Sequence, residues 1–150
     1  MADFAGAKAA IRQLLVDGWL TTRITYQNEA PGTPWPPVGV DGFPVPFINL
    51  EVATLASAMR GAGVPGKQTW LTDGFIYVHV FVPTGAGDAQ ATEYATAIGE
   101  IYRAKVFYLA APGCYVRTWA PRIDGGGSSD DDGNWFRVTM SVPFEYWHRG

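Results

Sequence analysis

The sequence predicts a single α+β domain in which a mixed or antiparallel sheet carries two helices on one face. Two stretches place apolar residues three and four positions apart, which is the spacing of one helix face. Five further stretches alternate polar and apolar residues or are rich in β-branched and aromatic ones, as strands are. With 150 residues, 47% of them hydrophobic, the chain can bury a core of its own. We therefore expect one domain over residues 1–150, with elements in the order α-β-β-β-α-β-β.

The first helix is predicted over residues 3–18. Its apolar positions fall on one face, and they are Phe4, Ala7, Ile11, Leu14 and Leu15. Asp3 can accept a hydrogen bond from a free N–H group of the first turn, and Gly18 stands where helices commonly end. Residues 21–27, which mix β-branched and aromatic side chains, are predicted to form a short strand.

Residues 28–46 are predicted to be a long proline-rich loop. They contain six prolines, which neither a helix nor a central strand tolerates. The loop also carries Trp35 and Phe43, and a long loop with large apolar side chains usually serves a function or covers another surface. Trp35 and Phe43 are therefore candidates for a subunit interface, with folding back onto the sheet as the alternative.

Two strands, 47–55 and 75–82, are predicted next, and a hairpin connection with a glycine-rich tip joins them over residues 56–68. The second helix begins near Asp88, its predicted N-cap. The apolar face of that helix consists of Ala91, Tyr94, Ala95, Ile98, Ile101 and Tyr102.

The last two strands are predicted over residues 115–121 and 135–147. Between them lies a glycine-rich acidic loop, residues 124–134, which has no apolar anchor and is expected to be mobile. Pro143 removes a donor from the last strand, which indicates a sheet edge or a bulge there.

Glycines 85 and 87 lie between a strand and a helix, where a dinucleotide-binding fingerprint would place its glycines. The sixth position of that pattern is Gln90 instead of glycine, and Asp88 would set a negative charge against a phosphate. A turn followed by a helix cap is the better interpretation.

His79 is one of two histidines and lies between Tyr77 and Phe81 in an apolar strand. We expect it to be a sheet residue that is hydrogen-bonded to a neighbour, not a catalytic base. Asp124, Asp130, Asp131 and Asp132 offer oxygen ligands for a hard cation, but the spacing of a calcium loop is absent. A solvated charge run is favoured. We expect no enzyme activity, catalytic residue, cofactor or metal.

The net charge argues against one class of function, and the single cysteine indicates the compartment. The net charge is −3, so no broad cationic surface is available for non-specific nucleic-acid binding. Cys114 cannot form an internal disulfide, which favours a reducing compartment. No apolar run approaches the length of a membrane span, and the first residues lack the features of a signal peptide. The sequence therefore predicts folding in the cytoplasm.

Four segments in this order resemble a known family. They are the amphipathic opening helix, the proline-rich loop that leads into residues 45–48, the run 74–87 before the second helix, and the closing run 135–144. Together they are similar to tail terminator proteins of long-tailed, non-contractile phages and gene transfer agents, the lambda-like terminator fold. The resemblance covers nearly the whole chain, although residues 61–66 and 130–132 depart from it.

The resemblance implies a structural protein of the virion tail or neck. Such subunits form a hexameric ring on the last ring of tail-tube protein, stop polymerisation and present a surface to the head connector or stopper protein. DNA would pass through the lumen without specific binding, no membrane would be involved, and assembly would occur in the cytoplasm of a bacterial host. Asp130, Asp131 and Asp132 are then candidates for a lumen or partner-facing loop. A neck or head-completion protein is a close alternative, and a small metal-dependent hydrolase or ligand-binding domain is a more distant one.

Overall fold

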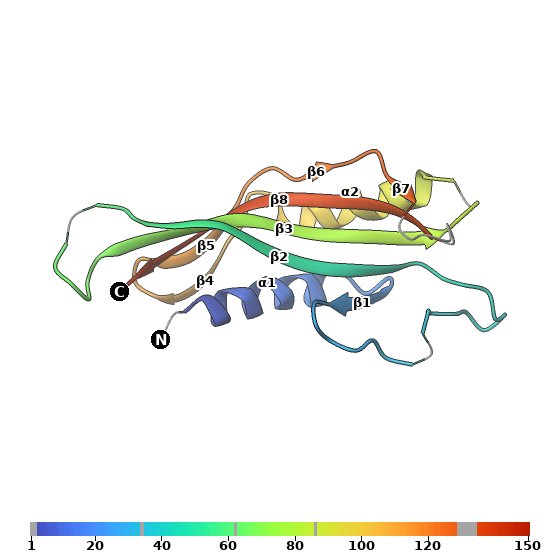
Figure 1. Cartoon of the computed structure of the whole chain (residues 1–150), viewed down its shortest axis with the longest axis horizontal. Helices are drawn as coiled ribbons and strands as arrows, with labels where there is room; N and C mark the ends of the chain where they lie inside the picture. The colour runs from blue at the N-terminus through green and yellow to red at the C-terminus, as the bar shows by residue number, and fades with distance from the viewer. Residues whose placement is uncertain (1–2, 34, 62, 86, 129–134) are drawn as a thin grey trace.

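A computed structural model of the chain describes residues 3–33, 35–61, 63–85, 87–128 and 135–150 (Figure 1). In chain order the elements are α1 (Phe4–Gly18), β1 (Arg23–Tyr26), β2 (Phe47–Met59), β3 (Thr69–Pro83), α2 (Ala89–Tyr102), β4 (Val106–Ala111), β5 (Cys114–Thr118), β6 (Arg122–Ile123), β7 (Gly127–Ser128) and β8 (Trp135–Arg149). The strands form one mixed sheet in the order β1-β2-β3-β8-β5-β4, and β6 and β7 also pair with β8. Only β1 and β2 pair in parallel among the described strands.

The two longest strands form the centre of the sheet. β3 and β8 are antiparallel along their full lengths, from Thr69 opposite Arg149 to Pro83 opposite Trp135. Alternate residues of these strands are buried, which is the period of two that a sheet with one covered face requires.

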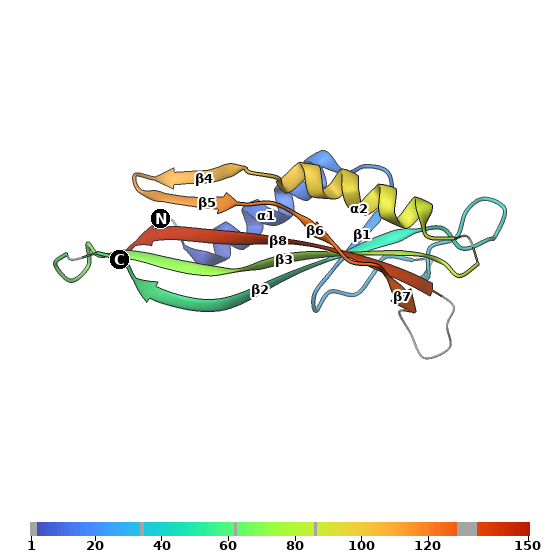
Figure 2. The same ribbon diagram turned by 90° about the horizontal axis from the view of Figure 1, so that it is seen from above.

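Both helices lie on the same face of the sheet (Figure 2). The Tyr102 hydroxyl donates to the Ile11 carbonyl oxygen over 2.7 Å, so α2 is tied directly to α1. The fully buried core contains Ile11, Leu15, Ile48, Ile76, Val78, Val80, Ile98, Met140, Val142 and Phe144, among others. The predicted α+β fold with two helices on one face is therefore confirmed. Among the described residues, no helix is long and apolar enough to cross a membrane.

The predicted helix starts are found, with one difference in capping. Asp3 precedes α1, and its Oδ1 accepts from the Gly6 N–H over 2.7 Å, as expected. Asp88 occupies the N-cap of α2, but its side chain makes no capping hydrogen bond. The backbone carbonyl of Asp88 instead accepts from Thr92 over 2.9 Å.

The connection predicted over residues 56–68 is much shorter in the structure. β2 continues to Met59 and β3 begins at Thr69, so the turn is confined to residues 60–68. A bulge falls between Thr54 and Ala56, and the strand beyond it is exposed. Sequence patterning failed here because a strand without a buried face shows no apolar alternation.

β4 and the position of Pro143 also differ from expectation. The sequence analysis did not predict β4. Tyr108 has a φ of 60°, and the pairing register shifts between Phe107 and Ala111. The regular alternation that identifies a strand in the sequence is therefore broken in β4. The prediction that Pro143 marks a sheet edge is wrong, because β8 is a central strand and Pro143 pairs with Phe75. The predicted irregularity is found on the other side of β8, where the register changes between Thr118 opposite Phe144 and Arg122 opposite Ser141. The Pro143 carbonyl oxygen accepts from the Trp119 N–H over 3.1 Å, in the gap between β5 and β6. Because neither β5 nor β6 pairs with β8 at this position, the lack of an N–H group in Pro143 costs no hydrogen bond between strands.

Candidate functional site

The start of the proline-rich loop is fastened to the domain by two arginines. The Arg12 guanidinium lies 3.5 Å from the centre of the Tyr26 ring and binds both carboxylate oxygens of Glu29, at 3.0 and 3.3 Å. The hydrogen bond to Glu29 is the main cause that raises the pKa of Arg12. Arg23 donates to the Gly32 carbonyl oxygen. The loop therefore leaves the body of the protein in a fixed direction.

The end of the loop is a small hairpin of its own. Val38 and Pro44 form a β-bridge. The Gly39 N–H donates to the Phe43 carbonyl oxygen over 2.9 Å, and the Val45 N–H donates to the Pro37 carbonyl oxygen over 3.1 Å. Phe43 is 70% exposed, and Val40 is fully exposed. This loop tip, residues 37–45, thus presents apolar side chains to solvent while its backbone is held.

Trp35 has different surroundings from Phe43. Its ring meets Phe47 edge-on, with 4.6 Å between ring centroids. Phe47 in turn stacks on Phe81 at 4.7 Å and meets Trp135 at 5.0 Å. Trp35 is the outermost ring of this aromatic cluster and remains 39% exposed. The structure therefore places one interface candidate partly against the sheet and the other wholly on the loop tip.

A second exposed apolar surface was missed by the sequence analysis. Residues 54–59 of β2 are all exposed, and so are the described residues of the turn up to Lys67. This arm, residues 54–68, carries Leu55 at 67% exposure, Val64 at 62% and Met59 at 47%. The arm and the proline-rich loop lie at opposite ends of the long axis of the molecule (Figure 1).

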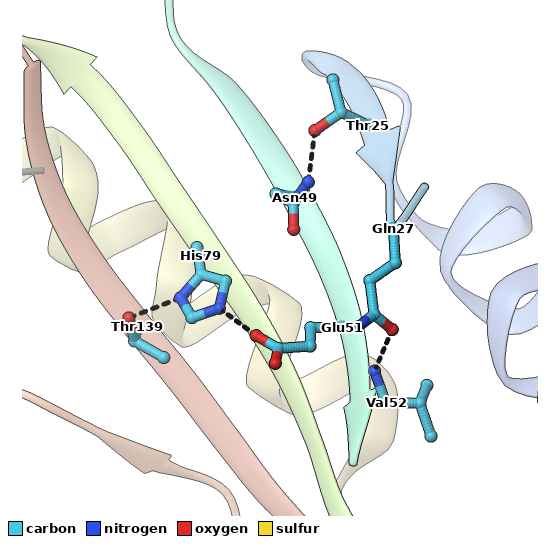
Figure 3. Close-up of polar contacts among 7 residues, drawn as sticks. All are labelled: Thr25, Gln27, Asn49, Glu51, Val52, His79 and Thr139. Carbon is cyan, nitrogen blue, oxygen red and sulfur yellow. Dashed lines mark hydrogen bonds and ion pairs between the residues drawn. The ribbon is translucent and has the colours of Figure 1, made fainter. Parts of the chain in front are cut away.

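The sheet face opposite the helices carries a polar cluster contributed by three strands (Figure 3). The His79 Nδ1 lies 2.8 Å from the Thr139 hydroxyl, and its Nε2 lies 2.9 Å from the Glu51 carboxylate. Tyr77 and Phe81 flank the imidazole along β3. The prediction that His79 is a hydrogen-bonded sheet residue is confirmed. Beside it, the Asn49 side chain donates to the Thr25 hydroxyl over 2.7 Å.

Hydroxyl, imidazole and carboxylate in this order are the groups that activate a nucleophile. Such a site also needs N–H donors aimed at the oxyanion that forms. The Thr139 N–H, however, already donates to the Asp124 carboxylate over 3.0 Å, and the Asp124 N–H donates back to the Thr139 carbonyl over 3.1 Å. The hydrogen bonds of His79 therefore link β2, β3 and β8 on this face of the sheet.

The acidic residues considered as cation ligands are only partly described. The Asp124 Oδ1 accepts from the Thr139 and Gly126 N–H groups, so that oxygen serves the backbone. Asp130, Asp131 and Asp132 lie outside the described residues. Within the ranges that the structure describes, no group of three His, Cys, Asp or Glu side chains is arranged to hold a metal ion.

Comparisons with known proteins establish a fold relationship. No family model and no curated protein matches the chain. Among solved structures, one protein superimposes with a TM-score of 0.67 at 18% sequence identity, covering 97% of this chain and 96% of the other. At this identity the likeness shows a shared fold over nearly the whole chain.

Proposed function

We propose that the protein is a structural component of a virion, a tail terminator. In this proposal its subunits form a hexameric ring on the end of the tail tube, stop tube growth and present a surface to which the head connector or stopper protein attaches. The sequence resemblance suggests the role. The observation that carries it is the pair of exposed apolar surfaces, the loop tip and the arm, at opposite ends of one elongated domain.

A closed ring requires two different surfaces on each subunit, because every copy contacts one neighbour with one surface and the next neighbour with the other. A twofold dimer needs only one self-complementary patch. Single exposed apolar side chains are normal on soluble proteins, but groups of them indicate contact sites. Phe43 and Val40 are exposed on the loop tip, and Leu55, Met59 and Val64 are exposed along the arm.

The arrangement of the polar groups is consistent with a role without chemistry. His79, Glu51 and Thr139 satisfy one another across the sheet, and the Asp124 carboxylate binds backbone N–H groups. In this account DNA passes through the ring lumen without specific binding. Asp130, Asp131 and Asp132 remain candidates for the lumen or for a partner-facing loop.

The proposal is tested by mixing the purified protein with tail-tube protein of the same virion and imaging the tubes in negative stain. We expect a ring at one end of each tube and a halt in tube elongation when the protein is added during polymerisation. The Leu109→Asp variant, changed at an exposed β4 residue outside both surfaces, is the matched control and should act like the wild type. Tubes that grow unchanged and bear no ring would contradict the proposal.

A further inference from the structure

We propose that the arm (residues 54–68) of one copy docks on the loop tip (residues 37–45) of the next copy. This inference rests on the proposed ring, because it names the surfaces that would join the ring's subunits. The contact is head to tail, so each copy uses its arm toward one neighbour and its loop tip toward the other. The partner in this inference is a second copy of the same chain.

The β2 residues of the arm are held in place by pairing with β3. β2 and β3 stay paired out to Met59 opposite Trp70, the Arg60 N–H donates to the Thr69 carbonyl over 2.8 Å, and the Thr72 and Ser57 hydroxyls bond at 3.0 Å. The β2 residues of the arm, 54–59, are exposed on both faces, although the β3 residues paired with them also pair with β8, so these β2 side chains gain little hydrophobic stabilisation inside their own subunit. The apolar side chains of the arm are thus available for a neighbour at a small cost in ordering.

The outer edge of β2 is also open along the arm. β1 covers that edge only from Phe47 to Leu50. Beyond Leu50, the Val52 N–H on this edge donates a hydrogen bond to the Gln27 side-chain oxygen over 3.2 Å. Among the described strands none pairs with this edge beyond that point. Unpaired strand edges accept extended segments of other chains, so the arm offers backbone groups as well as apolar side chains.

The two ends carry opposite charge. The arm bears Arg60 and Lys67 and, over residues 54–68, no acidic residue. In the part of the chain that the structure describes, neither cation forms an ion pair. The loop tip bears Asp41, whose Oδ1 accepts from the Phe43 N–H over 3.1 Å, and over residues 37–45 it has no basic residue. Opposite charges favour an arm against a loop tip and disfavour arm against arm.

The charges and apolar residues of the two surfaces indicate that the partner is a second copy of this chain. Each surface alone could receive many partners, but the chain itself contains a complement to each: apolar and basic at one end, apolar and acidic at the other. Because the two surfaces lie at opposite ends of the long axis, one contact leaves the other free for the next copy (Figure 1). Repetition of such a heterologous contact gives a ring when the rotation closes.

The test uses two variants that are blocked at different ends. V40D/F43D removes the apolar loop tip and L55D/V64D removes the apolar arm, and all four positions are exposed, so each subunit should keep the circular dichroism spectrum and melting curve of the wild type. Sedimentation velocity over a concentration series should show self-association at least about tenfold weaker for each variant alone. An equimolar mixture should form a two-chain species and stop there, because one intact arm and one intact loop tip remain. L109D should assemble like the wild type.

A charge exchange provides a second test if either aspartate pair unfolds the subunit. R60E/K67E and D41K should each weaken association, and mixing them should restore it in part. Wild-type assembly together with unaltered assembly of both blocked variants would overturn the inference while leaving the ring itself standing. Two weakened variants whose mixture gains no two-chain species would overturn the head-to-tail pairing. A wild-type chain that stays monomeric at every concentration and on tubes would overturn both this inference and the proposed function.

Discussion

Tyr102 and Ile11 join the two helices through one hydrogen bond of 2.7 Å between fully buried groups. Tyr146 is an equally buried phenol, but its hydroxyl has no hydrogen-bond partner among the described residues. The core therefore contains a matched pair of tyrosines, one bonded and one not.

We expect Tyr102→Phe to lower the free energy of unfolding by about 1 kcal/mol, because a buried hydrogen bond is lost and an acceptor loses a donor. Tyr146→Phe should change it by no more than about 0.5 kcal/mol, since the phenylalanine loses no bond and removes a desolvated hydroxyl. Urea denaturation at pH 7 measures both values. Equal losses in the two variants would show that the bond to Ile11 contributes nothing.

Alkaline pH should destabilise the protein in a defined window. Burial raises the pKa of Tyr146 from 10.0 to about 12 and also raises the pKa of Tyr102. Between pH 10 and the folded-state pKa, the unfolded chain loses a proton that the folded chain keeps, so stability is complete below pH 10 and falls above it. The slope per group is at most about 1.4 kcal/mol per pH unit.

Denaturation curves collected from pH 8 to pH 12 measure this loss. Between pH 10 and pH 12, the free energy of unfolding of Tyr146→Phe should fall less steeply with pH than that of the wild type, because its unfolding releases one proton fewer. A variant with the wild-type slope over that interval would mean that the Tyr146 hydroxyl ionises as freely in the folded state as in the unfolded one.

Gly74 should not tolerate a side chain. A Cβ there would stand 2.0 Å from the Ala53 carbonyl oxygen and 2.8 Å from the Thr54 Cα, both backbone atoms beside the bulge that begins the arm. We expect Gly74→Ala to cost about 2 kcal/mol or more, since β2 and β3 must separate. Gly125→Ala, where a Cβ meets nothing within 4 Å, is the control and should melt like the wild type. Similar melting of both variants would contradict the close approach.

Trp35 and Phe43 should respond differently to truncation. Trp35→Ala removes a ring that packs on Phe47, so it should lower the unfolding free energy by about 1 to 2 kcal/mol. Phe43→Ala should leave stability within about 0.5 kcal/mol, because the ring is 70% exposed, and should weaken self-association. Thermal melting and sedimentation separate the two effects. A stability loss in Phe43→Ala as large as in Trp35→Ala would place Phe43 in the fold instead of an interface.

The parts of the fold that sequence patterns predicted are those with one buried face. α1 and α2 repeat apolar residues at helical spacing because they cover the sheet, and β8 alternates because one of its faces meets them. Residues 54–59 of β2 have no buried face, so they leave no such pattern. Pro143 looked like an edge residue, because local chemistry cannot reveal that the neighbouring strand breaks opposite it.

The candidate surfaces could be predicted only in part. Trp35 and Phe43 stood out as large apolar residues among prolines, but only the fold separates the packed ring from the exposed one. The cluster of His79 with Glu51 and Thr139 joins residues that lie 28 and 60 positions from His79, and no local motif encodes it. The exposure of the arm's apolar residues is visible only in the folded chain.

The central claim is that copies of this chain form a ring, and the most direct measurement is the mass of the purified protein by light scattering across concentration, repeated with tail-tube protein. The account predicts a particle of six copies, formed alone at high concentration or on tube ends. A chain that keeps the mass of one subunit throughout and does not bind tubes would contradict it.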